Sequence, residues 1–168
     1  ISGADAKDFL QNILTNDIDK VDENNSIFSA IFTPQGKYMY EFFVIKNKDK
    51  YFLECTTEFA EDLISYLSKY KLRSNIQIHN ESSLFAVAII SLDKFEEIKE
   101  SEKIKGNTAL YRESTFFIDP RNINLGVRVI SNLEKLYLTI KKLNLKIIDD
   151  SEYLKKAHSL GIPIKGTK

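Results

Sequence analysis

Two runs of β-branched and aromatic residues flank a turn signal early in the chain. The runs cover residues 27–32 and 38–45, and Thr33-Pro-Gln-Gly-Lys37 lies between them. Proline presets the backbone at the start of a turn, and glycine accepts the positive φ that many tight turns need. This pattern predicts a β-hairpin, and residues 50–56 predict a third antiparallel strand after it.

Helices are predicted on both sides of this hairpin. One is expected to begin after Asp5 as its N-cap and another after Thr57, because apolar residues recur there every three or four positions. The apolar positions are Ala6, Phe9, Leu10, Ile13 and Leu14 in the first helix and Phe59, Leu63, Tyr66, Leu67 and Tyr70 in the second. Residues 76–79 are expected to return as a strand.

A similar order of elements recurs from Leu84 onward. Strands are predicted at residues 84–90, 108–111, 115–118, 126–130 and 146–148. Three helices are predicted: one at residues 93–100, one that begins after a capping box at Ser131–Glu134, and one from Asp149 to Gly161. The sequence therefore predicts an α+β fold of two duplicated halves, residues 1–80 and 81–168. Each half is expected to be a split β-α-β (ferredoxin-like) module with an antiparallel sheet, and a cleft between halves is the default place for a small ligand.

The charge balance and the composition limit the classes of molecule that this chain could bind. Lys plus Arg and Asp plus Glu are both 24, so no global field attracts nucleic acid, and such binding would need a local patch. One cysteine, Cys55, and two histidines offer no metal-ligand cluster. No apolar run approaches the length of a membrane span. We expect a small molecule or protein as partner, no nucleic acid, no membrane and no metal, and a setting in the cytosol or an organelle matrix.

Arginine is rare in a chain that prefers lysine. Only Arg73, Arg112, Arg121 and Arg128 occur among the 24 basic residues. Each arginine is a candidate for bidentate recognition of a carboxylate or phosphate, with a structural ion pair as the alternative. Neither a glycine-rich phosphate loop nor His-Glu-x-x-His nor Gly-x-Ser-x-Gly occurs in the sequence, which argues against nucleotide hydrolysis and zinc chemistry.

Five segments, in order, resemble one known family. They are the opening Ile1–Asp17, the turn Thr33–Lys37, Tyr70–Ile78, Asp119-Pro-Arg121 with Leu125-Gly-Val-Arg128, and Tyr153 through Gly161-Ile-Pro163. Together they resemble the YgfZ-like folate-binding proteins, relatives of the glycine-cleavage aminomethyltransferases. The resemblance implies the aminomethyltransferase folate-binding fold and tetrahydrofolate or a derivative as ligand. It also implies a role in iron–sulfur cluster assembly or repair, with assembly proteins or client enzymes, such as tRNA-modifying ones, as partners.

The chain departs from the aminomethyltransferases at two acidic positions. Their Gly-x-x-x-Asp-Asp pattern corresponds here to Gly36-Lys-Tyr-Met-Tyr40-Glu41, so Tyr40 replaces the first acid. A glutamate expected late in the last helix is replaced by Ser159. The comparison implies that classical aminomethyl transfer is absent, and Glu41 is the catalytic residue if there is one.

The same resemblance selects four candidate folate-binding residues. Tyr153 is expected to stack on the pterin, Arg121 to hold the carboxylates of the glutamate tail, and Asn16 and Asp17 to supply polar groups near the cleft. Each has a structural alternative. Tyr153 is otherwise a packing residue, Arg121 a partner for a neighbouring loop, and Asn16 and Asp17 ordinary residues of a helix C-terminal turn.

The family also carries a Lys-Gly-Cys-Tyr-x-Gly-Gln-Glu motif and a trailing β-barrel, which this chain lacks. We therefore expect it to be an N-terminal fragment of a YgfZ-like protein. Two alternatives stay open: a folate-dependent aminomethyltransferase or demethylase that uses Glu41, and a non-catalytic protein-interaction module.

Overall fold

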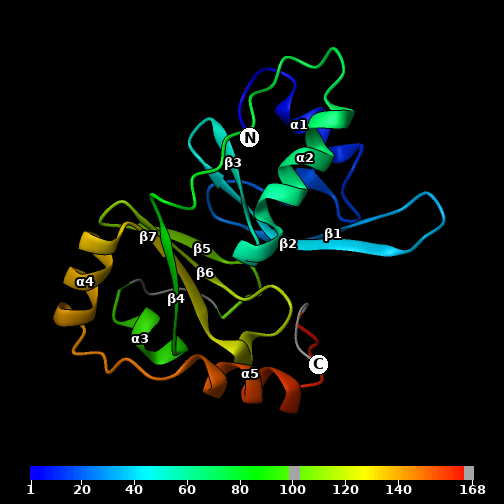
Figure 1. Ribbon diagram of the computed structural model, residues 1–168. Helices are drawn as coiled ribbons and strands as arrows, with labels where there is room; N and C mark the ends of the chain where they lie inside the picture. The colour runs from blue at the N-terminus through cyan, green and yellow to red at the C-terminus, as the bar shows by residue number, and fades with distance from the viewer. Residues whose placement is uncertain (99–102, 165–168) are drawn as a thin grey trace. The chain divides into compact units, whose positions relative to one another are not determined.

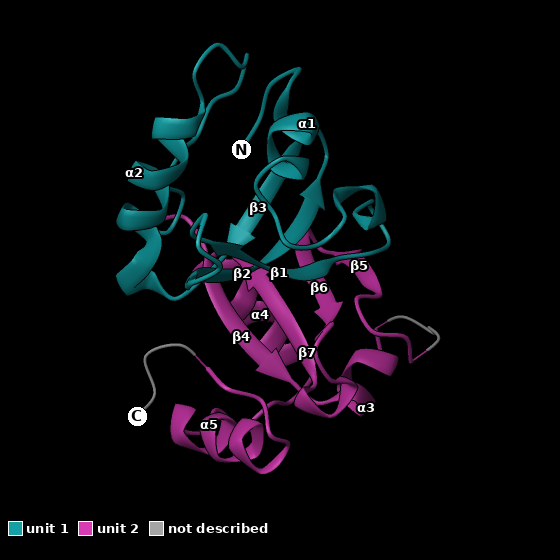
Figure 2. Ribbon diagram, turned by 90° about the vertical axis from the view of Figure 1, so that its right-hand side faces the viewer, with its two compact units in different colours: residues 1–83 teal, residues 84–168 magenta. Residues whose placement is uncertain are grey.

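The protein divides into two compact units. The computed structural model describes residues 1–98 and 103–164 (Figure 1). Unit 1 is Ile1–Ser83 and unit 2 is Leu84–Lys168, so the division falls just after the predicted end of the first half at residue 80 (Figure 2). Both units combine helices with an antiparallel sheet, and the predicted α+β class is confirmed.

Unit 1 is built around a three-stranded meander in the order β1-β2-β3. Its strands are β1 (Ile27–Phe32), β2 (Tyr38–Asn47) and β3 (Lys50–Glu54), and its helices are α1 (Ala6–Gln11), α2 (Ala60–Tyr70) and the short 3-10 turns Ile18–Lys20 and Thr57–Phe59. The predicted hairpin is confirmed: the Thr33 amide donates to the Lys37 carbonyl (2.7 Å), and Gly36 has a φ of 78°. Glycine accepts that conformation without a steric cost.

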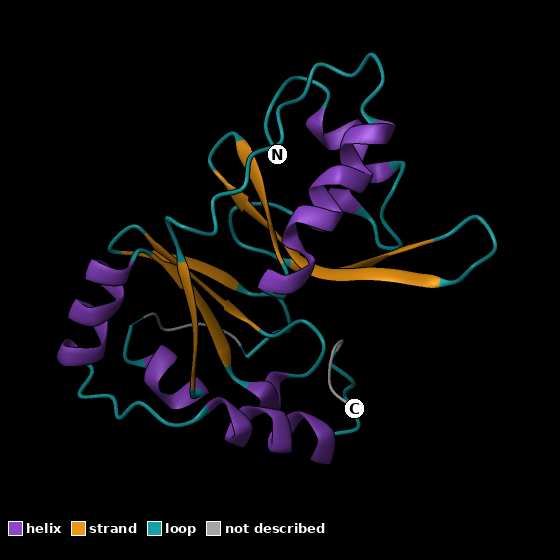
Figure 3. Ribbon diagram, in the orientation of Figure 1, coloured by secondary structure: helices purple, strands orange, loops and turns teal. Residues whose placement is uncertain are grey.

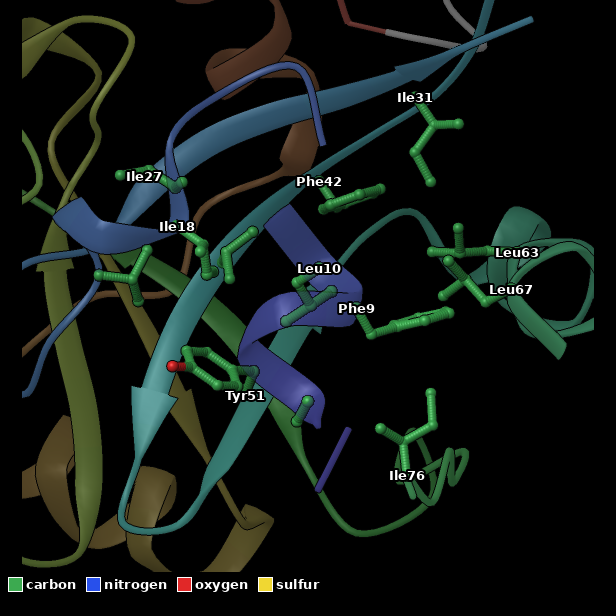
Figure 4. Packing of buried hydrophobic residues seen from close by; sticks show 13 residues of the cluster. Phe9, Leu10, Ile18, Ile27, Ile31, Phe42, Tyr51, Leu63, Leu67 and Ile76 are labelled. Atoms are coloured by element: carbon green, nitrogen blue, oxygen red, sulfur yellow. The ribbon is translucent and has the colours of Figure 1, made fainter. Parts of the chain in front are cut away.

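One face of this sheet carries the core of unit 1. Alternate residues of a strand point to the same face, so Phe42 and Val44 of β2 share a face and are both buried. Leu10 from α1 and Leu67 from α2 pack into the same cluster (Figure 4). The apolar residues that recur at helical spacing in the sequence therefore form the faces of α1 and α2 that pack against the sheet.

The segment after α2 pairs with the first residues of the chain instead of forming the predicted strand at 76–79. Ser2 and Gln77 form one isolated antiparallel bridge. The Asn75 amide donates to the Asp5 carboxylate (2.6 Å), so Asp5 stands at the N-cap position of α1 without capping it. A Cβ on Gly3 would lie 2.2 Å from the Asn75 carbonyl oxygen. The two backbones meet too closely there for any residue but glycine.

Unit 2 contains a four-stranded antiparallel sheet in the order β4-β7-β6-β5 (Figure 3). Its elements are β4 (Ala86–Ile90), α3 (Leu92–Glu96), β5 (Thr108–Tyr111), β6 (Ser114–Ile118), the 3-10 turn Ile123–Leu125, β7 (Val127–Ser131), α4 (Leu133–Lys142) and α5 (Asp150–Ser159). Phe95 of α3 and Leu136 of α4 pack against Phe116 and Val129 of the sheet. The helix predicted at 93–100 ends at Glu96, and its last two predicted positions lie outside the described residues.

Two local predictions in unit 2 are wrong. The N-cap of α4 is Asn132, whose side chain accepts from the Lys135 amide (2.8 Å). Ser131 cannot cap the helix because it still pairs with Ala86 in the sheet and shares a buried hydrogen bond with Ser114 (2.6 Å). Residues 146–148 form no strand, since no described neighbour pairs with them, and Ile147 is 77% exposed. Among the described residues, neither 76–79 nor 146–148 forms the returning strand that was predicted for its half.

Candidate functional site

The candidate site lies where β6 ends and β7 begins in unit 2. Ile118 pairs with Val127, and both face the α3–α4 core. Strand alternation therefore turns Asp119 and Arg128 to the other face of the sheet. The Asp119 amide continues the ladder by donating to the Gly126 carbonyl (3.0 Å). Gly126 has a φ of 96°, and a Cβ there would lie 2.4 Å from the Ile90 carbonyl oxygen, so this close approach requires glycine.

Asp119 fixes the side chain of Arg121. The carboxylate accepts from the Arg121 amide (2.9 Å), from Nε (3.0 Å) and from Nη2 (2.7 Å). The Asp119 side chain is 1% exposed and the Arg121 side chain is 11% exposed. A buried carboxylate is costly unless it is paired, and the bidentate guanidinium supplies that pairing.

Tyr153 of α5 completes the group. Its phenol oxygen accepts from Arg121 Nη2 (2.8 Å) and from Arg128 Nη1 (3.2 Å), and the Arg128 Cζ lies 6.0 Å from the centre of the ring. Two of the predicted folate-binding residues, Arg121 and Tyr153, therefore meet here, although they are 32 positions apart. The structure adds Asp119, to which the sequence analysis gave no site role, and Arg128, which it named only among the four arginines that could recognise a carboxylate or phosphate.

Electrostatics keep this network charged. Burial by itself lowers the pKa of the Arg121 guanidinium, but the hydrogen bonds and charge of Asp119 and the contact with Tyr153 outweigh it and raise that pKa. The Tyr153 oxygen thus joins two guanidinium groups, one of which is paired with the Asp119 carboxylate. The arrangement holds the half-buried Tyr153 in place by its oxygen.

Asn16 and Asp17 belong to unit 1 and make local hydrogen bonds. The Asn16 Nδ2 donates to the Phe28 carbonyl (3.0 Å), and its Oδ1 accepts from the Asp17 amide (2.8 Å). The Asp17 carboxylate accepts from the Asp19 amide (3.0 Å) and so caps the short turn Ile18–Lys20. These bonds match the structural alternative for both residues, and their proposed contact with folate stays a prediction.

Tyr40, which the resemblance placed at an acidic position of the aminomethyltransferases, lies on β2. Its ring packs against Tyr66 of α2, with ring centres 5.5 Å apart. Burial, followed by the charge of Asp62, raises the pKa of Tyr40. A phenol with a raised pKa is neutral near pH 7 and cannot replace a carboxylate. Glu41 is the next residue on β2, pairs with Ala30 across the ladder, and accepts a hydrogen bond from the Tyr38 hydroxyl.

Ser159 and Cys55 show no catalytic arrangement. The Ser159 hydroxyl donates to the Lys156 carbonyl in its own helix (2.8 Å). Burial and the charge of Glu54 raise the pKa of Cys55 to about 11, which leaves a neutral thiol. Residues 1–98 and 103–164 contain no cluster of His, Cys, Asp and Glu placed to hold a metal ion. Over the same residues, no helix has the length and apolar character needed to cross a membrane.

Sequence comparison connects the chain to two groups of proteins. It is 25% identical over 150 residues to a mitochondrial iron-sulfur cluster assembly factor IBA57 homolog from Mycosarcoma maydis, covering 81% of this chain and 34% of the relative. It is 26% identical over 89 residues to an aminomethyltransferase from Alcanivorax borkumensis, covering 53% of this chain and 25% of the relative. No family model matches the sequence.

The fold is similar to that of a solved aminomethyltransferase structure. The glycine cleavage system aminomethyltransferase T from Bartonella henselae superposes with a TM-score of 0.67 at 12% identity, over 84% of this chain and 41% of that one. The protein therefore has the aminomethyltransferase fold. The chain spans about a third or less of the length of the curated relatives that it matches.

Proposed function

We propose that this chain is the folate-binding part of a YgfZ-like protein that supports iron–sulfur cluster assembly or repair without classical aminomethyl transfer. The observation that carries folate binding is the fixed Tyr153. Two guanidinium groups hold its oxygen, so the ring is preorganised to stack on a flat ligand such as a pterin. The positive charge of Arg121 and Arg128 suits the carboxylates of a glutamate tail.

The cluster-assembly role rests on the relatives. The similarity to the IBA57 homolog covers 81% of this chain, compared with 53% for the aminomethyltransferase from Alcanivorax borkumensis. Tyr40 and Ser159 stand where the aminomethyltransferases keep carboxylates, and neither side chain supplies a negative charge near neutral pH. Iron–sulfur assembly proteins or cluster enzymes, including tRNA-modifying ones, are the proposed partners. The IBA57 relatives are mitochondrial, which favours an organelle matrix if the protein is eukaryotic. For a bacterial protein we propose the cytoplasm.

Calorimetric titration with tetrahydrofolate under anaerobic conditions tests the binding step. We expect measurable binding, weakened by roughly 1 to 2 kcal/mol in Tyr153→Ala, the scale of one lost aromatic contact. Tyr137→Ala is the matched control, since that tyrosine also lies on a helix of unit 2 but is 55% exposed. Absence of any heat of binding in the folded wild-type chain would favour the protein-interaction module instead.

The second candidate function is an enzyme, a folate-dependent aminomethyltransferase or demethylase that uses Glu41 as its acid. Glu41 is the acid that remains beside Tyr40, and its carboxylate is oriented by Tyr38. A glycine-cleavage or sarcosine assay with tetrahydrofolate decides between the candidates. We expect no turnover, whereas turnover that disappears in Glu41→Gln would establish the aminomethyltransferase or demethylase.

A complementation test in a strain that lacks its own YgfZ-like protein examines the cellular role. We expect residues 1–168 alone to be folded but not to rescue activity of the cluster enzymes, because the family's cysteine motif is absent from them. Rescue by these residues would show that the cysteine motif is dispensable.

A further inference from the structure

A second group of cations lies in unit 2, around Tyr111, which is half-buried against the unit 2 core, and the exposed Tyr137. Lys142 Nζ donates to the Tyr111 hydroxyl (2.8 Å), and the Arg112 Cζ lies 5.5 Å from the centre of the same ring. Lys141 Nζ lies 4.6 Å from the centre of the Tyr137 ring. The hydrogen bond from Lys142, with the nearby charge of Arg112, lowers the pKa of Tyr111. We call Tyr111, Arg112, Tyr137, Lys141 and Lys142 the α4 basic surface.

Few acids oppose these charges. Glu113 forms an ion pair with Lys135, and Glu134 lies in the first turn of α4. Within residues 1–98 and 103–164, no carboxylate forms an ion pair with Arg112, Lys141 or Lys142. The chain as a whole has a formal net charge of zero, so this surface is the local patch that a polyanion would need.

The backbone of the β5–β6 turn accepts strain to place Arg112 there. Tyr111 pairs with Ser114, which leaves Arg112 and Glu113 as a two-residue loop with φ values of 50° and 61°. Such a loop normally carries Asn-Gly, because a positive φ is unfavourable for other residues. Arg112 adopts this unfavourable conformation beside the Tyr111 ring, and strained positions of this kind cluster at functional sites.

We propose that the α4 basic surface binds single-stranded nucleic acid. Arginine and lysine bind backbone phosphates, while tyrosine rings stack on bases without sequence preference. The α4 basic surface contains this combination twice. One group is Tyr111 with Arg112 and Lys142, and the other is Tyr137 with Lys141, which lies one helical turn further along α4. Two adjacent groups fit an extended chain of nucleotides better than a single phosphate. This proposal does not depend on folate binding.

An anionic membrane is a weaker fit to the same helix. Leu133 and Leu138 of α4 are 74% and 49% exposed, which is apolar surface that a bilayer would bury. At 3.6 residues per turn, however, Lys141 lies between these two leucines around the helix. The exposed side therefore alternates apolar and cationic residues and lacks the separate apolar face of an interfacial helix.

Fluorescence anisotropy with a fluorescein-labelled oligouridylate of about 12 nucleotides tests the proposal, the length spanning one single-strand site. The full chain is titrated between about 50 and 200 mM KCl, where phosphate contacts weaken steeply. We expect the double variant Arg112→Asn with Lys142→Ala to bind at least tenfold more weakly. Its log–log salt slope should be shallower by about 1.4, or 0.7 for each lost phosphate contact. Tyr137→Ala should weaken binding with little change in slope.

Control measurements separate a loss of RNA binding at this surface from a loss of folding or of net positive charge. Asn suits the left-handed turn, so Arg112→Asn should not lower the thermal midpoint measured by circular dichroism. Lys69→Ala with Arg73→Ala removes two exposed cations of unit 1 and should leave binding unchanged. Glu113→Gly releases Lys135 from its ion pair and should strengthen binding.

Three outcomes would overturn the proposal. The first is no binding of RNA at about 100 µM protein in 50 mM salt, the weak end of non-specific affinity. The second is equal loss of affinity in the unit 1 control pair. The third is binding to phosphatidylserine vesicles with no binding to RNA, which would assign the surface to a membrane.

Discussion

Tyr153→Phe removes one oxygen atom from the candidate site and leaves the ring in place. That oxygen accepts from Arg121 (2.8 Å) and from Arg128 (3.2 Å), and Arg128 is only 9% exposed. A hydrogen bond to a charged group contributes roughly 1.5 to 3 kcal/mol. The bond to Arg128 is long, and Arg121 keeps both side-chain bonds to Asp119, so Arg121 does not lose every acceptor. We therefore expect a loss of about 2 to 3 kcal/mol in the free energy of unfolding, less than two full bonds.

Urea unfolding followed by far-UV circular dichroism measures this loss. The chain contains no tryptophan, so a backbone signal is preferable to fluorescence. Tyr137→Phe serves as the control because its ring is 55% exposed, and we expect a change within about 0.5 kcal/mol there. If Tyr153→Phe also stays within about 0.5 kcal/mol, the phenol oxygen is not the shared acceptor of the two guanidinium groups, and the preorganisation of Tyr153 has to be abandoned.

Three further predictions concern groups whose environment the structure defines. Asn132→Ala should destabilise the protein by about 1 kcal/mol in the same urea assay, because it removes the side-chain cap of α4; an effect near zero would return the cap to Ser131. Arg121→Lys should cost roughly 1 to 3 kcal/mol, since lysine cannot reproduce the bidentate pair with the buried Asp119; full stability in the lysine variant would contradict that pairing. Stability should fall as the pH rises from about 9 to about 11, because folding raises the pKa of Cys55 and the unfolded chain loses its thiol proton first; in Cys55→Ala this part of the pH dependence should be absent.

Local chemistry determined much of the fold. The hairpin turn at Thr33–Lys37 depends on a hydroxyl, a proline and a glycine within five neighbouring positions, and it forms as predicted. The last helix begins after Asp149, whose carboxylate accepts from the Ser151 amide (2.8 Å), and it ends before Gly161. Such features need only residues that are close in sequence, so the sequence specifies them directly.

The errors arose where a distant segment changed the outcome. Residues 76–79 have strand-forming residues, but they contact the start of the chain through a single bridge at Ser2. Ser131 fits a capping box, yet its pairing with Ala86 keeps it in the sheet and moves the cap to Asn132. In both cases pairing with residues far away in the chain overrides a correct local preference.

The candidate site shows the same division. The sequence determined that Asp119 and Arg121 meet, because a turn of Asp-Pro-Arg brings the carboxylate to the Arg121 amide. It also supplied a resemblance that selected Tyr153. Only the tertiary structure decided that the Tyr153 oxygen joins Arg121 to Arg128, since those three side chains come from a turn, a helix and a strand. Spacing along the chain carries no information about such a meeting, which depends on how α5 packs beside the Ile123–Leu125 turn.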